Sequence, residues 1–119
     1  TGTLPSEIGN LTDLRTLHLR DNSLSGAIPS EIGNLINLIN LNLGFNDFTG
    51  SIPSTIGNLS NLTNIELDDN NLSGIVPDEI CNLGGIEFNT GWIQNNQLCP
   101  PYPSCIEDTM GDQDTSNCN

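Results

Sequence analysis

Few side chains in this sequence of 119 residues are of the types that catalyse reactions. The chain has one histidine, His18, and no Gly-x-Ser-x-Gly motif, so nothing indicates a nucleophile activated by a neighbouring base. Carboxylate pairs such as Glu66 and Asp68 could supply an acid and a base for glycoside hydrolysis, but such pairs occur by composition alone and require a cleft. We therefore predict no catalytic residues and no enzymatic activity.

The other reactive side chains are the cysteines Cys81, Cys99, Cys105 and Cys118. They form no Cys-x-x-Cys pair, and His18 is far away in the sequence, which disfavours a zinc site. Two disulfides, formed in an oxidising compartment, are the better interpretation. Four cysteines permit three pairings.

Acidic residues dominate the charge of the chain. The net charge is −13, and no lysine or arginine follows Arg20, which argues against nucleic acid or an anionic membrane as partner. Residues 112–116 resemble the start of a calcium loop but lack its sixth-position glycine and closing glutamate, so we predict neither a metal nor a cofactor. No apolar run approaches the ~18 residues of a membrane-spanning helix.

These residues are carried by a unit of 24 residues that occurs three times, over residues 11–34, 35–58 and 59–82. Apolar residues recur at fixed offsets: Leu14, Leu38 and Leu62; Leu17, Leu41 and Ile65; Leu19, Leu43 and Leu67. An asparagine recurs at Asn22, Asn46 and Asn70. This period, with this pattern of leucine and asparagine, predicts a solenoid of leucine-rich repeats, which typically forms an extended binding surface.

Each unit combines a short strand with a turn region. Apolar and polar residues alternate in the first part of the unit, which predicts a strand in which Leu17 and Leu19 point inward and His18 points outward. The equivalent strands of successive coils should lie side by side in a parallel sheet. The asparagine amide can bond to backbone groups of its own and adjacent coils, forming a ladder. Further on, Gly26 permits a positive φ and Pro29 blocks regular helix, so we expect short 3-10 turns after each proline.

The unit LxxLxxLxLxxNxLSGxIPxxIGN resembles the plant-type leucine-rich repeat of receptor-kinase ectodomains, polygalacturonase-inhibiting proteins and some bacterial surface proteins. The resemblance covers about residues 1–98, and its LSGxIP segment is highly specific. It implies a right-handed superhelix with a parallel sheet on the concave face, a second short strand near the Ser-Gly-x-Ile-Pro segment, and short 3-10 turns on the convex side. It also implies binding rather than catalysis, by a protein that is secreted or exposed at the cell surface.

Both ends of the chain depart from the repeat. Residues 1–10 match the back half of a unit, so we expect a fragment of a longer protein. Residues 83–98 form an irregular fourth repeat, in which Asn96 takes the asparagine position after an insertion of two residues. Residues 99–119 show no repeat pattern, and their prolines, cysteines and acids predict a disulfide-bonded C-terminal cap.

The repeat register favours one pairing of the cysteines. Cys81 replaces the glycine of the Ile-Gly-Asn segment, and one coil later that column falls near Cys105. The predicted disulfides are therefore Cys81–Cys105 and Cys99–Cys118.

The outward positions of the strands form columns on the concave face. The candidate ligand-binding residues are His18, Arg20, Asn42, Phe45, Glu66, Asp68 and Trp92. Phe45 and Trp92 are large aromatics that this arrangement exposes, and exposed aromatics often anchor partners. Trp92 has an alternative role, which is packing under the cap.

Several functions fit this surface. We favour an extracellular, monomeric recognition module that binds a peptide, protein or glycan through the concave sheet. The alternative is a structural or adhesive repeat segment without its own ligand. An inhibitor of a secreted polysaccharide-degrading enzyme follows from the resemblance only. Ice binding would use a column of Thr16, Asn40, Asn64 and Thr90, but charged and aromatic neighbours interrupt its flatness.

Four N-x-S/T sequons begin at Asn10, Asn58, Asn61 and Asn71. The repeat consensus generates some of them automatically, so they are compatible with N-glycosylation without establishing it.

Overall fold

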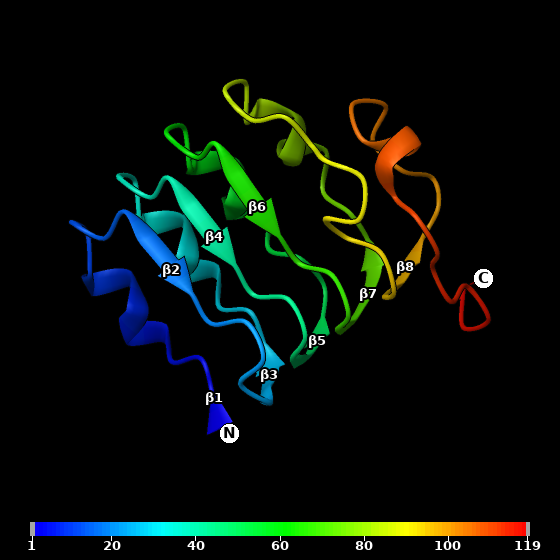
Figure 1. Cartoon of the computed structure of the whole chain (residues 1–119), viewed down its shortest axis with the longest axis horizontal. Coiled ribbons are helices and arrows are strands. Elements are labelled where there is room, and N and C mark those ends of the chain that lie inside the picture. The colour runs from blue at the N-terminus through cyan, green and yellow to red at the C-terminus, as the bar shows by residue number, and fades with distance from the viewer. Residues whose placement is uncertain (1, 119) are drawn as a thin grey trace.

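The computed structural model describes residues 2–118 and shows a stack of coils closed by the C-terminal tail (Figure 1). Each of the three regular coils passes through a strand of one sheet, a strand of a second sheet and a short 3-10 helix before the next coil begins. The stack measures 38 × 32 × 21 Å along its principal axes. The predicted leucine-rich-repeat solenoid is confirmed.

One sheet, here called the concave sheet, contains β2 (Thr16–His18), β4 (Asn40–Asn42) and β6 (Asn64–Glu66). The strands are parallel and pair in the predicted register, because Leu17 lies opposite Leu41 and Leu41 opposite Ile65. These three residues are buried, which fixes the register, since a slip by one residue would turn them outward.

The second sheet, here called the flank sheet, is also parallel and has the order β1-β3-β5-β7-β8. Its strands are β1 (Gly2–Thr3), β3 (Leu24–Ala27), β5 (Asp47–Gly50), β7 (Asn71–Ile75) and β8 (Gln97–Cys99). Four of them contain the glycine of the repeat with a positive φ, of 102° at Gly2, 78° at Gly26, 75° at Gly50 and 76° at Gly74. The second strand implied by the plant-type resemblance is therefore present in each regular coil.

Short 3-10 helices complete the coils: η1 (Ser6–Asn10), η2 (Ser30–Asn34), η3 (Ser54–Asn58), η4 (Asp78–Asn82) and η5 (Glu107–Thr109). The first four begin directly after a proline, as predicted. The proline backbone is extended, for example with φ −66° and ψ 140° at Pro53, so the helix begins one residue later. None of the helices in residues 2–118 is long and apolar enough to cross a membrane.

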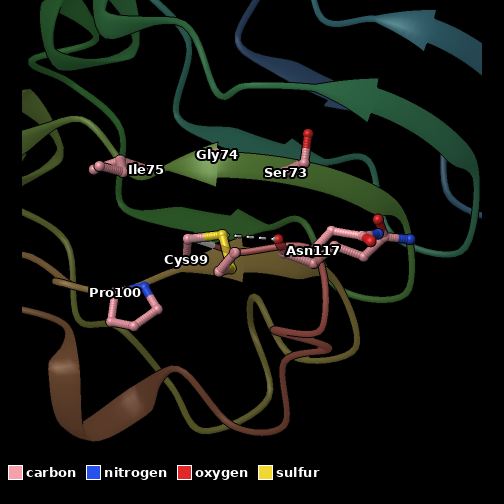
Figure 2. Close-up of a pocket in the computed structure, with 8 residues that line it drawn as sticks. Ser73, Gly74, Ile75, Cys99, Pro100 and Asn117 are labelled. Carbon is pink, nitrogen blue, oxygen red and sulfur yellow. Dashed lines mark hydrogen bonds between the residues drawn. A yellow bond between two sulfur atoms is a disulfide. The ribbon is translucent and has the colours of Figure 1, made fainter.

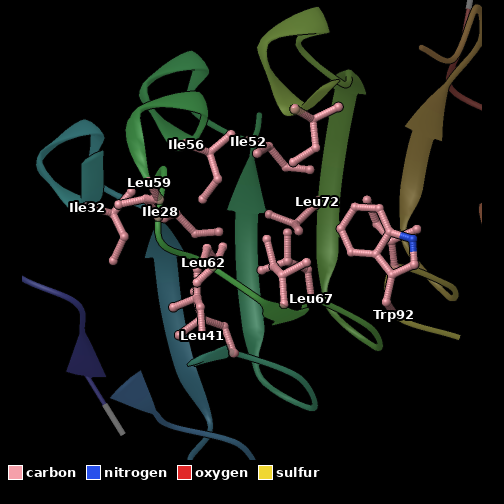
Figure 3. Close-up of a cluster of buried hydrophobic side chains, with 14 of the residues drawn as sticks. Ile28, Ile32, Leu41, Ile52, Ile56, Leu59, Leu62, Leu67, Leu72 and Trp92 are labelled. Carbon is pink, nitrogen blue, oxygen red and sulfur yellow. The ribbon is translucent and has the colours of Figure 1, made fainter. Parts of the chain in front are cut away.

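The core is a narrow column of aliphatic side chains that runs through the stack (Figure 3). Leu41, Leu43, Ile56 and Leu59 in the middle coils are at most 1% exposed. At the open first layer, in contrast, Leu11 is 52% exposed, because no coil covers it within the described residues. The interior is therefore packed most completely in the middle of the stack.

The irregular fourth repeat keeps the backbone register but loses the concave strand. The amide of Leu67 donates to the carbonyl oxygen of Trp92 at 2.6 Å, as the amide of Leu43 does to Glu66 at 2.9 Å. Gly91, with φ 92°, stands where a leucine would continue the strand, and the chain turns there instead. The predicted alignment with two extra residues thus holds for the backbone.

The C-terminal tail adds a partial coil that its sequence did not indicate. Ile106 and Met110 enter the core with 0% and 3% exposure. Near the end of this coil, Gln113 forms a parallel bridge with Asn96. The cap therefore continues the stacking of the repeats with different residues and spacing.

Candidate binding face

The concave sheet brings together the predicted residues of the first three coils. His18, Asn42 and Glu66 lie side by side at the ends of β2, β4 and β6. Arg20, Phe45 and Asp68 follow in the turns after these strands. The side chains do not stand as separate solvated positions, because several of them bond to one another across the coils.

Arg20 in the first full coil and Asp68 in the third form an ion pair across the second coil. The Nη1 and Nη2 atoms of Arg20 each lie 3.1 Å from a different carboxylate oxygen of Asp68. Two parallel hydrogen bonds of this kind fix the orientation of the guanidinium group in addition to pairing its charge. The hydrogen bond to Asp68 also raises the pKa of Arg20 above its ordinary value, so the guanidinium stays charged.

Gly44 lies between these two partners and makes their contact possible. A Cβ atom at this position would clash with the guanidinium of Arg20 and would lie 2.7 Å from Asp68 Oδ1. This role of Gly44 was not predicted from the sequence. The available signal was a glycine in the column that Arg20 and Asp68 occupy in the neighbouring coils.

Asn42 extends the ion pair into a network over three coils. Its Oδ1 accepts hydrogen bonds from the Gly44 amide at 3.1 Å and from Arg20 Nη1 at 3.4 Å. Its Nδ2 donates to Glu66 Oε2 at 2.7 Å. Asn42 and Asp68 are only 7% and 5% exposed, so they hold Arg20 and Glu66 in place more than they present themselves to a ligand.

Phe45 stands out on this face because it is a large apolar side chain with 47% of its surface exposed. The guanidinium carbon of Arg20 lies 4.5 Å from its ring centroid, which is within the range of a cation–π contact. Since Arg20 is itself held by Asp68, the ring has a fixed neighbour on the protein side. The exposure of Phe45 agrees with the sequence-based expectation.

The carboxylates beside this aromatic give the face an acidic character. Glu66 is partly exposed, and Asp21 is exposed. Burial and the neighbouring Asp68 raise the pKa of Asp69, while the hydrogen bond from Asn95 Nδ2 at 2.9 Å partly offsets this effect. The face thus favours cationic groups over anionic ones.

Trp92 does not belong to this surface, and the expectation that it is exposed was wrong. Its side chain is 2% exposed, and its ring centroid lies 4.8 Å from that of Phe88. Its Nε1 donates to Thr109 Oγ1 in the cap at 3.0 Å. The turn at Gly91 replaces the concave strand, and the indole fills the core where the repeat lacks its leucine. The alternative role, packing under the cap, describes the structure.

The asparagine ladder supports the turns that carry the binding face. Asn46 Nδ2 donates to the carbonyls of Leu19, Leu43 and Gly44, and its Oδ1 accepts from the amides of Asn22 and Leu24. Asn70 and Asn96 repeat this pattern in the following coils. Asn22, in the first coil, is more exposed and donates to the carbonyl of Arg20 at 3.2 Å.

Two sets of hydrogen bonds made by side-chain amides were not predicted from the sequence. Gln113 acts as a further rung, because its Nε2 donates to the Ile93 carbonyl at 2.9 Å and its Oε1 accepts from the Leu98 amide at 3.2 Å. On the opposite side of the strands, Asn37 donates to the carbonyl of Thr12 and Asn61 to that of Ile36, both at 2.9 Å. The recurrence of Asn37 and Asn61 at the repeat spacing was a signal for the second set.

The cysteines form the disulfides Cys81–Cys105 and Cys99–Cys118, which is the pairing that the repeat register favours. In preceding coils the Cys81 position is glycine because the next helix lies against it; a Cβ at Gly57 would be 2.6 Å from the Glu79 carbonyl oxygen. The Cys99–Cys118 disulfide borders a pocket of about 540 Å³ beside β7, which Figure 2 shows with Ser73 and Ile75. Residues 2–118 contain no group of acidic, histidine or cysteine side chains suited to a metal ion.

A family model described as Leucine Rich Repeat matches residues 13–35, 37–59 and 61–83. These matches cover more than half of the chain, which therefore belongs to the leucine-rich repeat family. No curated protein matches it.

Solved structures identify the plant type of this family. The ectodomain of the plant membrane receptor kinase GASSHO1/SCHENGEN3 from Arabidopsis thaliana, in complex with CASPARIAN STRIP INTEGRITY FACTOR 2, is 32% identical with a TM-score of 0.82, over 91% of this chain and 13% of that one. The Arabidopsis receptor kinase HAESA, in complex with the peptide hormone IDA and the co-receptor SERK1, is 38% identical with a TM-score of 0.75, over 82% and 16%. The BIR2 ectodomain from Arabidopsis thaliana is 29% identical with a TM-score of 0.86, over 95% and 62%.

This chain spans less than two thirds of the length of each of these structures. The resemblance to plant receptor-kinase ectodomains that the LSGxIP unit indicated is confirmed.

Proposed function

We propose that this chain is an extracellular recognition module whose concave sheet binds a peptide or protein partner with a cationic segment. GASSHO1/SCHENGEN3 and BIR2 are solved as ectodomains, and HAESA is described in complex with a peptide hormone and a co-receptor. The two disulfides are in keeping with an oxidising extracellular compartment. The function is binding rather than catalysis, and the module acts as a monomer.

The observation that carries this proposal is the exposed ring of Phe45 on a face where hydrogen bonds hold Arg20, Asn42 and Glu66 in place. Aromatic residues of this kind supply much contact area at little conformational cost. Arg20 and Asn42 position the ring and Glu66 before any partner arrives, which lowers the entropy lost on binding.

The charge of the face selects the class of partner. Arg20 is paired with Asp68, so its charge is already neutralised, whereas Glu66, Asp21 and Asp69 are left to interact with a ligand. An extended segment with lysine or arginine would gain ion pairs there, while an acidic segment would be repelled. His18, at the end of β2, is exposed and lies at the edge of the same surface.

The proposal can be tested with a library of unstructured peptides in which each cationic member has a counterpart with lysine replaced by glutamate. We expect cationic peptides to bind the chain and binding to weaken as salt rises, since the contacts are partly electrostatic. Phe45→Ala and Glu66→Gln should each lower affinity by roughly tenfold, which corresponds to about 1.4 kcal/mol.

Ile36→Ala is the matched control, because Ile36 is 55% exposed but lies outside the concave face. It should leave the affinity unchanged. Equal binding of both peptide sets, or equal loss in the Phe45 and Ile36 variants, would contradict the proposal. Absence of any binding would favour the alternative of a repeat segment without its own ligand.

A further inference from the structure

The sequons of this chain differ in what the fold does with their asparagines. Asn61 donates its side-chain amide to the carbonyl of Ile36, so that amide contributes to the stacking of the coils. Asn10 and Asn58 end the helices η1 and η3 and are exposed at the junctions between coils. Asn71 is also exposed, but it lies elsewhere, at the start of β7 in the flank sheet.

The asparagine of the sequon at Asn71 does not come from the repeat, although its serine, Ser73, belongs to the recurring Leu-Ser-Gly segment. The Gly-Asn-Leu segment at each coil junction yields the sequons at Asn10 and Asn58 whenever serine or threonine follows. The column of Asn71, in contrast, contains Ser23 and Asp47 in the first two coils. Within residues 2–118 the side-chain amide of Asn71 makes no hydrogen bond, so it can be modified without loss of an internal contact.

A polar pocket of about 430 Å³ opens directly beside Asn71. Its walls include Asn95, Gln97, Asp112 and Asp114, which belong to the last coil and the cap. Amides and carboxylates of this kind donate to and accept from hydroxyl and acetamido groups. A pocket of this size and polarity is suited to a sugar residue, and its position allows a sugar attached to Asn71 to reach it.

We infer that Asn71 is an N-glycosylation site whose first N-acetylglucosamine lies in this pocket. The inference depends on the extracellular location in the proposed function, because the modification takes place in the secretory pathway. A bond forms between Asn71 Nδ2 and the sugar C1 of a lipid-pyrophosphate-linked oligosaccharide. The bond from C1 to the pyrophosphate breaks, the lipid pyrophosphate leaves, and Nδ2 loses one proton.

This placement would connect the glycan to the end of the solenoid. The pocket also borders Asn96 and Gln113, the last two rungs of the asparagine ladder. A sugar seated there covers these rungs and contacts both β7 and the cap. The glycan should therefore protect the junction of the cap with the last coil, whereas a glycan at Asn58, which is exposed at a coil junction, would extend into solvent.

The test uses the full chain secreted from a eukaryotic culture. Peptide-N-glycosidase F in heavy-oxygen water converts each occupied asparagine to a labelled aspartate, which mass spectrometry of proteolytic peptides assigns to its site. We expect label at Asn71 and slower release of its glycan than of the Asn58 glycan from the native protein. After denaturation the two glycans should be released at equal rates.

Two pocket variants provide the matched comparison. Gln97→Ala and Asp112→Ala remove wall side chains that make no hydrogen bond to any other part of residues 2–118. They should raise the release rate at Asn71 toward that at Asn58 without changing the latter. Absence of label at Asn71 overturns the site, and equal native release rates at Asn71 and Asn58 overturn the seat in the pocket. Peptide binding by Asn71→Gln, measured as above, should be unchanged, so failure here is distinct from failure of the proposed function.

Discussion

The regular coils and the C-terminal cap meet the same structural requirement with different side chains. In the coils, Asn46 and Asn70 satisfy the backbone groups of the turns. In the cap, Gln113 satisfies the corresponding groups from a segment without the repeat pattern. Likewise, leucines fill the core of the coils, whereas Trp92 fills it under the cap. The cap thus keeps the positions of the buried hydrogen-bonding side chains, although it does not keep the spacing or the sequence of the repeat.

The largest effect should come from the core of the cap. Trp92→Ala leaves a cavity between Phe88 and the cap and should lower the free energy of unfolding by about 3–5 kcal/mol. Trp92→Phe keeps most of the volume and loses the bond to Thr109, so its cost should be smaller. Urea denaturation of the two variants beside wild type measures both. Equal, near-zero losses would mean that the cap does not share the core of the coils.

The disulfides should rank next. Replacing both Cys81 and Cys105 by alanine removes a link between residues 24 positions apart, and should cost about 3 kcal/mol. The loss should appear as faster hydrogen exchange in η4 and the cap, while β4 and β6 stay protected. Exchange that rises equally in β4 and β6 would show that the cap and coils unfold as one unit, against the distinction drawn here.

The rungs of the ladder allow a direct comparison between a coil and the cap. Asn46→Ala strands several buried backbone groups and should cost at least about 2 kcal/mol, since each such group costs about 1–3 kcal/mol. Gln113→Ala should cost about 1 kcal/mol, because its surroundings are partly open to water. Asn37→Ala serves as control, since its single bond is exposed. If the Gln113 variant is as stable as wild type, Gln113 does not act as a rung of the ladder.

The sequence predicted the coils better than the cap for a physical reason. A period of 24 residues fixes which side chains face inward. The spacing of equivalent residues therefore predicted the concave sheet, the asparagine ladder and the outward column of His18, Asn42 and Glu66. The environment of Trp92 depended on a turn at Gly91, which has no counterpart in the repeats. The role of Gln113 depended on a longer side chain reaching the place of an asparagine, which no local pattern reveals.

The smallest effect concerns Asp69, whose side chain links the third coil to Asn95 in the fourth. Burial and Asp68 raise the pKa of Asp69 above 3.8, so the folded state retains a proton that the unfolded chain has released. The free energy of unfolding therefore falls as pH rises from about 3.8 through the raised pKa of the folded state. Asp69→Asn cannot titrate and keeps the acceptor for Asn95, so it should melt slightly higher than wild type at neutral pH and equally at low pH. Asp47→Asn, at an exposed position in the flank sheet, controls for the change in net charge. A gain of the same size in both variants would assign the effect to net charge and not to the contact between the third and fourth coils.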